Sequence, residues 1–286
     1  MSTWLLGDRL VNRIGFGAMR LPQTGPAFEP GSPPRDRDQA IAVLRKAVEL
    51  GINHIDTAAF YFSALRSANE LINSALSPYP DDLVIATKVG PSRDPSGEWR
   101  SPASPRELRG QVEENLRQLG RDHLDLVYLR AEGPGSDLAD RFAALAELRQ
   151  AGLIRHLGIS AVGPHHLAEA QVIAPVVAVQ NSYGLGYRPA QDEFIRLCGE
   201  QGVAFVPFFS ITGANREAGG GADAQVRLAW TLARGPHVLV IPGTGDPAHL
   251  AENVAAGDLR LSDDELVRLD ATHHLSQSAA SRSSTS

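Results

Sequence analysis

Three side chains near the ends of two apolar segments have the types needed to move a proton. Asp56 ends the segment Asn53–Asp56, Tyr61 follows it by five residues, and Lys88 ends the segment Leu83–Lys88. A phenol with a pKa of about 10 is a weak acid at neutral pH, but a lysine ammonium within hydrogen-bond distance stabilises its phenolate. An aspartate would keep that lysine charged and oriented. The three residue types together predict a tyrosine that acts as a general acid.

Each of these residues also has an ordinary structural role that the sequence leaves open. An aspartate at a strand end often caps a loop, a tyrosine often packs in a core, and a lysine at a strand end is often only solvated. The chemical interpretation therefore depends on a fold that brings all three side chains to one place.

Short apolar, β-branched runs alternate with longer segments of helical periodicity, which is the pattern of parallel strands joined by helices. Eight runs are predicted strands: Arg13–Gly17, Asn53–Asp56, Leu83–Lys88, Leu124–Leu129, Ile154–Ser160, Val176–Gln180, Ala204–Phe209 and Val238–Ile241. The predicted helices are about Asp38–Leu50, Ser67–Leu76, Ser104–Leu119, Leu138–Ala151, Pro164–Ile173, Ala190–Gln201, Gly221–Ala233 and Pro247–Ala256. Eight such units favour a (β/α)8 TIM barrel, preceded by a short N-terminal β-hairpin.

An open, doubly wound sheet has the same periodicity, but a dinucleotide-binding sheet usually has a G-x-G-x-x-G turn after its first strand. The segment GFGAMRLPQTG lacks both that spacing and an immediate helix. Two long loops, Leu21–Arg35 and Val89–Ser104, follow the first and third strands, so we expect them at the carboxyl end of the barrel, where active sites are built.

The C-terminal part predicts one extra helix and a tail. Leu261 to about His273 has the pattern of a helix capped by Ser262. We expect one barrel domain over residues 1–272 and a disordered, serine-rich tail over residues 273–286.

The composition excludes several classes of protein. The net charge is −6 and no run of Lys or Arg could hold a nucleic acid. Cys198 is the only cysteine, so no internal disulfide is possible, and its helical context predicts a packed core thiol. His165-His166 and His273-His274 lack the spacing of a zinc motif, and no metal is expected. No export signal or long apolar span is evident, which predicts a cytoplasmic protein.

The sequence resembles the aldo-keto reductase family over nearly its whole length. The resemblance is carried by VNRIGFGAMRL, GINHIDTAAFY, ATKVG, LRQLGRDHLDLVYL, LRQAGLIRHLGIS, VAVQNSY and IPGTGDPAHLAENV. It implies an enzyme that transfers a hydride from NADPH to a small aldehyde or ketone, with NADH not excluded. It also implies that Tyr61 donates the proton, while Lys88 and Asp56 adjust the acidity of its hydroxyl.

Arg130 stands where the family usually has a histidine, in LDLVYLRAEG. An arginine can donate to a carbonyl oxygen but cannot relay a proton. Three roles remain open for Arg130. It could stabilise charge on the reacting oxygen, bind an anionic group of the substrate, or form an ion pair with Glu132.

By the same resemblance, several residues are expected to hold the nucleotide. The family's Ser-Asn pair and Gln, which hold the carboxamide, read Ser160, Ala161 and Gln180, so the Asn is lost. Phe208 is the aromatic expected to stack on the nicotinamide. The remaining expected contacts on this side are Gly17, Ala18, Met19 and Asp56.

The family's phosphate-binding signature appears here as IPGTGDPAHLAEN. Gly243 stands for a Lys, Thr244 for a Ser and His249 for an Arg, while Glu252 and Asn253 are retained. The two lost cations normally neutralise the 2′-phosphate that distinguishes NADP from NAD. Backbone N–H groups of residues 243–245 and the start of the following helix are then expected to supply the anion site.

The IPGT form, the arginine at 130 and the PFF segment resemble the pyridoxal reductase branch of the family, which implies reduction of pyridoxal to pyridoxine. Two alternatives stay open. One is a tailoring ketoreductase of a secondary metabolite or deoxysugar, and the other is a catalytically silent, nucleotide-sensing regulatory protein. The oligomeric state is not readable from the sequence.

Overall fold

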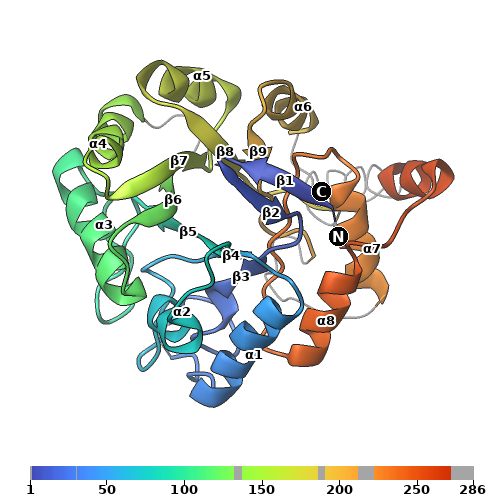
Figure 1. Cartoon of the computed structure of the whole chain (residues 1–286), viewed down its shortest axis with the longest axis horizontal. Helices are drawn as coiled ribbons and strands as arrows, with labels where there is room; N and C mark the ends of the chain where they lie inside the picture. The colour runs from blue at the N-terminus through green and yellow to red at the C-terminus, as the bar shows by residue number, and fades with distance from the viewer. Residues whose placement is uncertain (1, 30, 132–136, 186–190, 212–221, 272–286) are drawn as a thin grey trace, which may run out of the picture.

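The computed structural model describes residues 2–29, 31–131, 137–185, 191–211 and 222–271. The expected serine-rich tail, residues 273–286, lies outside these ranges. In Figure 1 the helices form a ring around a central parallel sheet, as the sequence predicts.

The central sheet is parallel and its strands follow one another in chain order. Its strands are β3 (Phe16–Gly17), β4 (His54–Asp56), β5 (Val84–Val89), β6 (Leu124–Arg130), β7 (Ile154–Ser160), β8 (Val176–Gln180) and β9 (Ala204–Phe205). Isolated parallel bridges join Phe205 to Val238 and Val240 to Ile14. The expected eighth strand is therefore present as bridging residues, and it closes the sheet into the predicted barrel.

The helices begin and end close to their predicted limits. They are α1 (Arg37–Glu49), α2 (Ala68–Leu76), α3 (Pro105–Leu119), α4 (Ala139–Gln150), α5 (Pro164–Ile173), α6 (Asp192–Glu200), α7 (Ala222–Leu232) and α8 (Pro247–Ala255). The predicted start of α3 is confirmed, because the backbone N–H of Ser104 donates to the carboxylate of Glu107 at 2.8 Å. The helix ends at Gly120, whose φ of 62° is the left-handed conformation that glycine adopts readily.

The expected C-terminal helix covers residues 263–271. Ser262 begins it, since its backbone N–H donates to Glu265 at 2.8 Å and its hydroxyl accepts from the N–H of Glu265 at 3.3 Å. Trp230 of α7 donates to Asp270 at 2.9 Å, which fixes this helix against the barrel. No helix among the described residues is long and apolar enough to cross a membrane.

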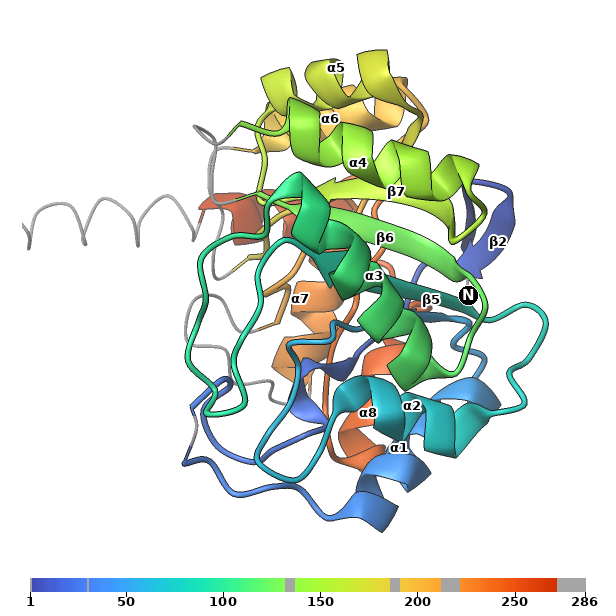
Figure 2. The ribbon, with the colours of Figure 1, turned by 90° about the vertical axis from the view of Figure 1, so that its left-hand side faces the viewer.

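The expected N-terminal hairpin consists of β1 (Thr3–Leu6) and β2 (Arg9–Asn12), which pair antiparallel. Figure 2 places it at the end of the barrel opposite the long loops. Leu6 and Val11 are buried in the barrel interior with Leu126 and Tyr128. The hairpin therefore plugs one end of the barrel, and the functional side chains lie at the other.

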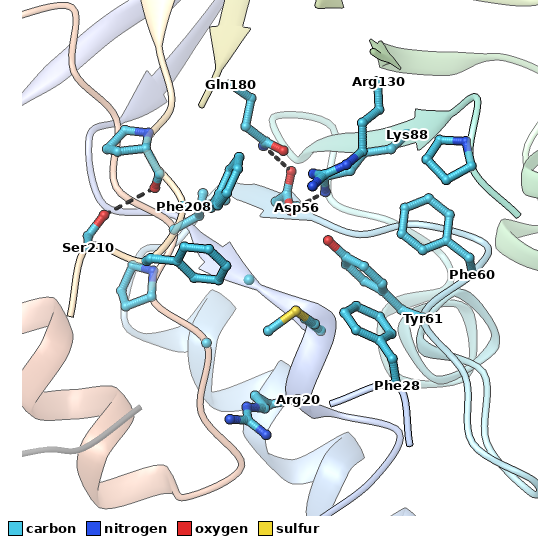
Figure 3. A pocket seen from close by; sticks show the side chains of 18 of the residues that line it. Arg20, Phe28, Asp56, Phe60, Tyr61, Lys88, Arg130, Gln180, Phe208 and Ser210 are labelled. Carbon is cyan, nitrogen blue, oxygen red and sulfur yellow. Dashed lines mark hydrogen bonds and ion pairs between the residues drawn. The ribbon is translucent and has the colours of Figure 1, made fainter. Parts of the chain in front are cut away.

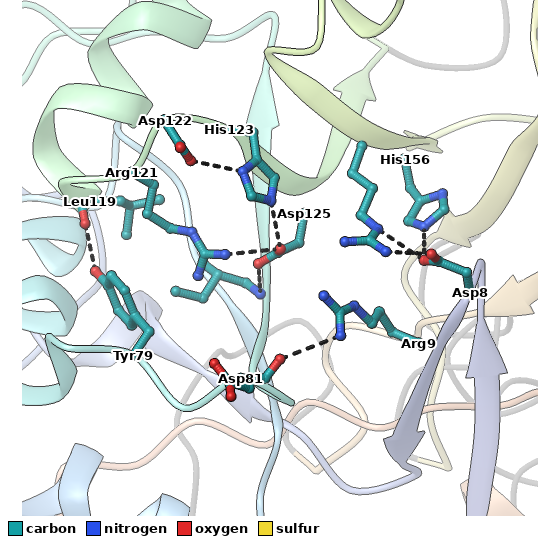
Figure 4. Close-up of polar contacts among 12 residues, drawn as sticks. Asp8, Arg9, Tyr79, Asp81, Leu119, Arg121, Asp122, His123, Asp125 and His156 are labelled. Atoms are coloured by element: carbon teal, nitrogen blue, oxygen red, sulfur yellow. Dashed lines mark hydrogen bonds and ion pairs between the residues drawn. The ribbon is translucent and has the colours of Figure 1, made fainter.

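Polar contacts hold the hairpin in place (Figure 4). Asp8, in the turn of the hairpin, accepts from Nε of Arg155 at 3.0 Å and contacts Nε2 of His156 at 2.6 Å. The hydrogen bond from Arg155, followed by that from His156, lowers the pKa of Asp8 well below its usual range.

Candidate active site

Lys88 and Asp56 form a buried ion pair at the carboxyl ends of β5 and β4. Nζ of Lys88 lies 2.5 Å from Oδ1 of Asp56 and donates to the carbonyl O of Thr57 at 3.0 Å. Oδ2 of Asp56 accepts from Nε2 of Gln180 at 2.7 Å. Both charged side chains are almost fully buried, which is tolerated because each is paired and hydrogen-bonded.

The surroundings of Lys88 keep it protonated. Burial lowers the pKa of its ammonium, but the Asp56 carboxylate and the Tyr61 hydroxyl raise it, and the net pKa lies above the ordinary value. The predicted role of Asp56, to keep this lysine charged, therefore agrees with the geometry.

Tyr61 lies beside this pair in the loop between β4 and α2. Nζ of Lys88 is 4.9 Å from the centroid of the Tyr61 ring. The rings of Phe60 and Phe28 flank the tyrosine, with centroids 5.1 and 5.8 Å away. In Figure 3 the hydroxyl of Tyr61 points toward the Asp56–Lys88 pair. The fold thus brings the three sequence-predicted residues together.

Arg130 is the last residue of β6, and its side chain reaches the same place. Its guanidinium Cζ lies 5.3 Å from the centroid of the Phe208 ring, a cation–π contact. Glu132, the expected ion-pair partner in one of the three roles open to Arg130, lies outside the described residues. Arg130 and Phe208 both line the central cavity.

The central cavity has a volume of about 340 Å³ and is mostly apolar. Of the residues predicted from the sequence, it is lined by Gly17, Met19, Asp56, Tyr61, Lys88, Arg130, Gln180, Phe208 and Gly243. Sequence reasoning missed the other aromatic and basic residues of its wall, namely Arg20, Phe28, Phe60, Trp99 and Phe209. All five lie in or next to loops that follow strands, and that position was the only available signal.

Arg93 ties three of these loops together. Its guanidinium donates to the carbonyl O of Gly97 at 2.8 Å, of Phe62 at 3.0 Å and of Phe28 at 3.1 Å. It also stacks on the Phe62 ring, with Cζ 4.6 Å from the centroid. Burial lowers its pKa, and Glu98 and Asp94 partly offset that effect. The shape of the cavity wall thus depends on one arginine that the sequence did not single out.

Two of the expected carboxamide-holding side chains have polar atoms that remain without a partner among the residues described. These atoms are Oγ of Ser160 and Oε1 of Gln180, both buried. Ala161, where the family has Asn, has a φ of 59°, in the left-handed region that costs an alanine about 1 kcal/mol or more. The unsatisfied oxygen of Gln180, whose amide N binds Asp56, is an acceptor that an amide ligand would require.

The expected phosphate segment lines a second, polar cavity. Gly243, Thr244 and His249 lie on its wall. Asn253 is buried on α8 and neither its amide N nor its amide O has a partner in the part of the chain that is described. Four of the predicted residues line neither cavity: Ala18, Ser160, Glu252 and Asn253.

Cys198, predicted to be a core thiol, is fully buried on α6. Burial raises the pKa of its thiol to about 12, so it is no nucleophile at neutral pH. This prediction is confirmed.

The closed barrel, with ionisable side chains gathered at the carboxyl ends of its strands, defines an α/β-barrel enzyme. The sequence matches the model of the Aldo/keto reductase family over residues 13–219, and the chain belongs to that family. It is an oxidoreductase, and members of the family use NADPH or NADH. The expected resemblance is confirmed.

The chain is similar to other proteins both in sequence and in three-dimensional structure. Pyridoxine 4-dehydrogenase of Escherichia coli strain K12 is 44% identical, covering 94% of this chain and 97% of that protein. An uncharacterised oxidoreductase of Schizosaccharomyces pombe is 38% identical, covering 94% of this chain and 89% of its own length. The crystal structure of an aldo-keto reductase of Klebsiella pneumoniae in complex with NADPH has a TM-score of 0.78, is 25% identical and covers 95% of each chain.

Proposed function

We propose that this protein reduces an aldehyde with NADPH, that Tyr61 is the proton donor, and that pyridoxal is the substrate. The observation that carries the proposal is the buried Asp56–Lys88 pair beside Tyr61 at the mouth of the barrel. An ammonium in that position stabilises the phenolate that remains after proton transfer. The family supports an enzyme that acts on small carbonyl compounds, and the Escherichia coli relative is named for pyridoxine.

The residues around the pair are suited to hold a nicotinamide ring. Gln180, which lines the cavity, carries an unsatisfied buried oxygen that a carboxamide would pair with, and Phe208 offers a ring face in the same cavity. Ser160, whose Oγ is also unsatisfied, lies beside Gln180 on the neighbouring strand. When bound, the coenzyme supplies a hydride to the carbonyl carbon, which leaves a negative charge on the carbonyl oxygen.

The side chains of the cavity then neutralise or stabilise that charge. Tyr61 donates its proton to the oxygen, and Lys88 stabilises the resulting phenolate. The guanidinium of Arg130 stabilises negative charge on the substrate without exchanging a proton. The buried position of the pair excludes water and strengthens these interactions.

The walls of the cavity also favour a planar aromatic substrate. Phe28, Phe60 and Trp99 form one side of it, with centroid separations of 5.3 Å between Phe28 and Trp99 and 5.6 Å between Phe60 and Trp99. Pyridoxal is a flat ring whose phenolic oxygen, next to the aldehyde, ionises readily. In this proposal Arg130, which lines the same cavity, binds that oxygen.

The test is NADPH oxidation by the purified protein with pyridoxal and a panel of small aldehydes and ketones. Tyr61→Phe should lower kcat at least about 100-fold and leave NADPH binding, measured by calorimetry, unchanged. Tyr79→Phe is the matched control, because Tyr79 binds the carbonyl O of Leu119 away from the cavity. Unchanged turnover in Tyr61→Phe would reject the assignment.

The panel also separates the alternatives. Turnover of bulky ketones but not of pyridoxal would favour a tailoring ketoreductase. Nucleotide binding without oxidation by any carbonyl would favour a regulatory protein.

A further inference from the structure

The polar cavity beside the central one has a volume of about 370 Å³. Arg20 and Gly243 line both cavities, so the two adjoin. The other residues on the wall of the polar cavity are Gln23, Gly25, Arg35, Gln39, Thr244, Gly245, Asp246 and His249.

The charges on this wall favour an anion. Arg35 and His249 lie on the wall together with the carboxylate of Asp246. Oδ1 of Asp246 is also engaged, because it accepts from the backbone N–H of Ala248 at 2.8 Å and caps α8. Arg35 adds a guanidinium to this wall next to the N-terminus of α8, and both features favour an anion.

Arg35 reaches this wall from the loop after β3. Its Nε donates to the carbonyl O of Arg20 at 3.2 Å, and this is the only hydrogen bond of the Arg35 side chain to a residue that the structure describes. Burial lowers the pKa of its guanidinium, and Asp246 raises it in part. Arg35 therefore holds its charge in a partly desolvated place with Nη groups available to a ligand.

Gly245 makes room for this arginine. A Cβ on Gly245 would lie 2.0 Å from Cζ of Arg35, so any other residue at 245 would displace the guanidinium. Gln39 of α1 fixes the same backbone, since its Nε2 donates to the carbonyl O of Gly245 at 3.0 Å. The guanidinium thus lies flat against the segment that the sequence analysis assigned to phosphate binding.

A lysine could not occupy position 243 in this backbone. A Cβ on Gly243 would lie 2.4 Å from the carbonyl O of Gly17, where the ends of two barrel segments meet. The cation that the family carries at this position is therefore sterically excluded here, and a replacement must come from another element.

We infer that Arg35 is the residue that recognises the 2′-phosphate of NADPH and sets the preference for NADPH over NADH. This inference rests on the proposed function. Arg20 lines both cavities, whereas Arg35 lines only the outer one, which is further from the nicotinamide position beside Tyr61. An arginine is well suited to the role, because its guanidinium binds a phosphate through two parallel hydrogen bonds.

The test is isothermal calorimetry of NADP⁺ and NAD⁺ binding to the full chain. Arg35→Met should weaken NADP⁺ binding about 10- to 100-fold and change NAD⁺ binding less than about threefold. Arg35→Lys should recover part of the loss. Gly245→Ala should weaken NADP⁺ binding as Arg35→Met does, because the added Cβ displaces the guanidinium although its charge is kept. Arg37→Met is the matched control: Arg37 is an exposed neighbour paired with Asp38 and does not line the cavity.

The outcomes separate this inference from the proposed function. If Arg35→Met weakened the binding of NADP⁺ and NAD⁺ equally, the arginine would bind a phosphate common to both nucleotides, and the inference would be overturned. Unchanged affinity for NADP⁺ in Arg35→Met would also overturn it. Neither result affects carbonyl reduction, whereas a wild-type chain that binds neither nucleotide would overturn the proposed function itself.

Discussion

Arg93 binds Phe28 in two ways: Nη2 donates to its carbonyl O at 3.1 Å, and Cζ lies 5.6 Å from the centroid of its ring. The two residues belong to different loops, 65 positions apart in the chain. The aromatic wall of the central cavity is therefore assembled by a contact between loops and not by the barrel strands.

Replacement of Arg93 by alanine would leave several buried carbonyl groups without a donor. We expect the free energy of unfolding to fall by about 2–4 kcal/mol and KM for the aldehyde to rise more than kcat falls. Urea unfolding and steady-state kinetics measure both. Arg100→Ala, at an exposed arginine of the same loop, is the control and should change neither quantity. Equal effects of the two substitutions would show that Arg93 has no special role.

Arg130→Met should lower kcat/KM for pyridoxal about 100-fold, because it removes a fixed positive charge from the cavity. The loss should be smaller for benzaldehyde, which has no phenolic oxygen, if Arg130 binds that oxygen. Identical losses for the two substrates would instead assign Arg130 to the reacting carbonyl. Comparison of kcat/KM across both aldehydes decides between the two roles.

Ala161→Gly should raise the free energy of unfolding by about 1 kcal/mol, because the φ of 59° is strained for alanine and free for glycine. Ala151→Gly is the control, since Ala151 has a φ of −72° and glycine there should be neutral or destabilising. Chemical unfolding of the three proteins tests this. A lower stability of Ala161→Gly would contradict it.

The hairpin that plugs the barrel should loosen in acid. The folded-state pKa of Asp8 lies below the ordinary aspartate value of 3.8, so its contacts with Arg155 and His156 contribute stability above pH of about 4. That contribution is lost as the pH falls from there through the folded-state pKa. Asp8 is half exposed, so the contribution should be below about 1 kcal/mol.

Unfolding of wild type and Asp8→Asn, followed over this pH range, measures the effect. The difference between the two proteins should shrink as the pH falls below 4. A difference that stays constant would show that the Asp8 carboxylate does not couple the hairpin to the barrel.

The sequence was sufficient to predict the barrel and the Asp56–Lys88–Tyr61 cluster. Strand-end residues of neighbouring parallel strands must meet at one edge, and apolar runs locate those strands. The first, seventh and eighth strands were predicted too long. The structure has Phe16–Gly17 and Ala204–Phe205 for the first and seventh, and only Val238 and Val240 of the eighth form bridges. The single domain over residues 1–272 and the cytoplasmic location stay predictions.

Residues whose position depends on tertiary contacts between loops could not be predicted. Arg93 contacts the carbonyl of Phe28 65 positions away, and Arg35 packs on Gly245 from a different loop. No periodicity or motif connects such pairs. The sequence showed that Gly243 departs from the family pattern. Only the fold shows why glycine is needed there, because the Gly17 backbone approaches it closely.

The loop between β3 and α1 contributes Phe28 to the wall of the central cavity and Arg35 to the wall of the polar one. One short stretch of backbone thus contributes to the walls of both cavities. A ligand that shifts this stretch in one cavity would shift the wall of the other cavity as well. Engineering of this enzyme toward NADH would accordingly alter the range of aldehydes it accepts.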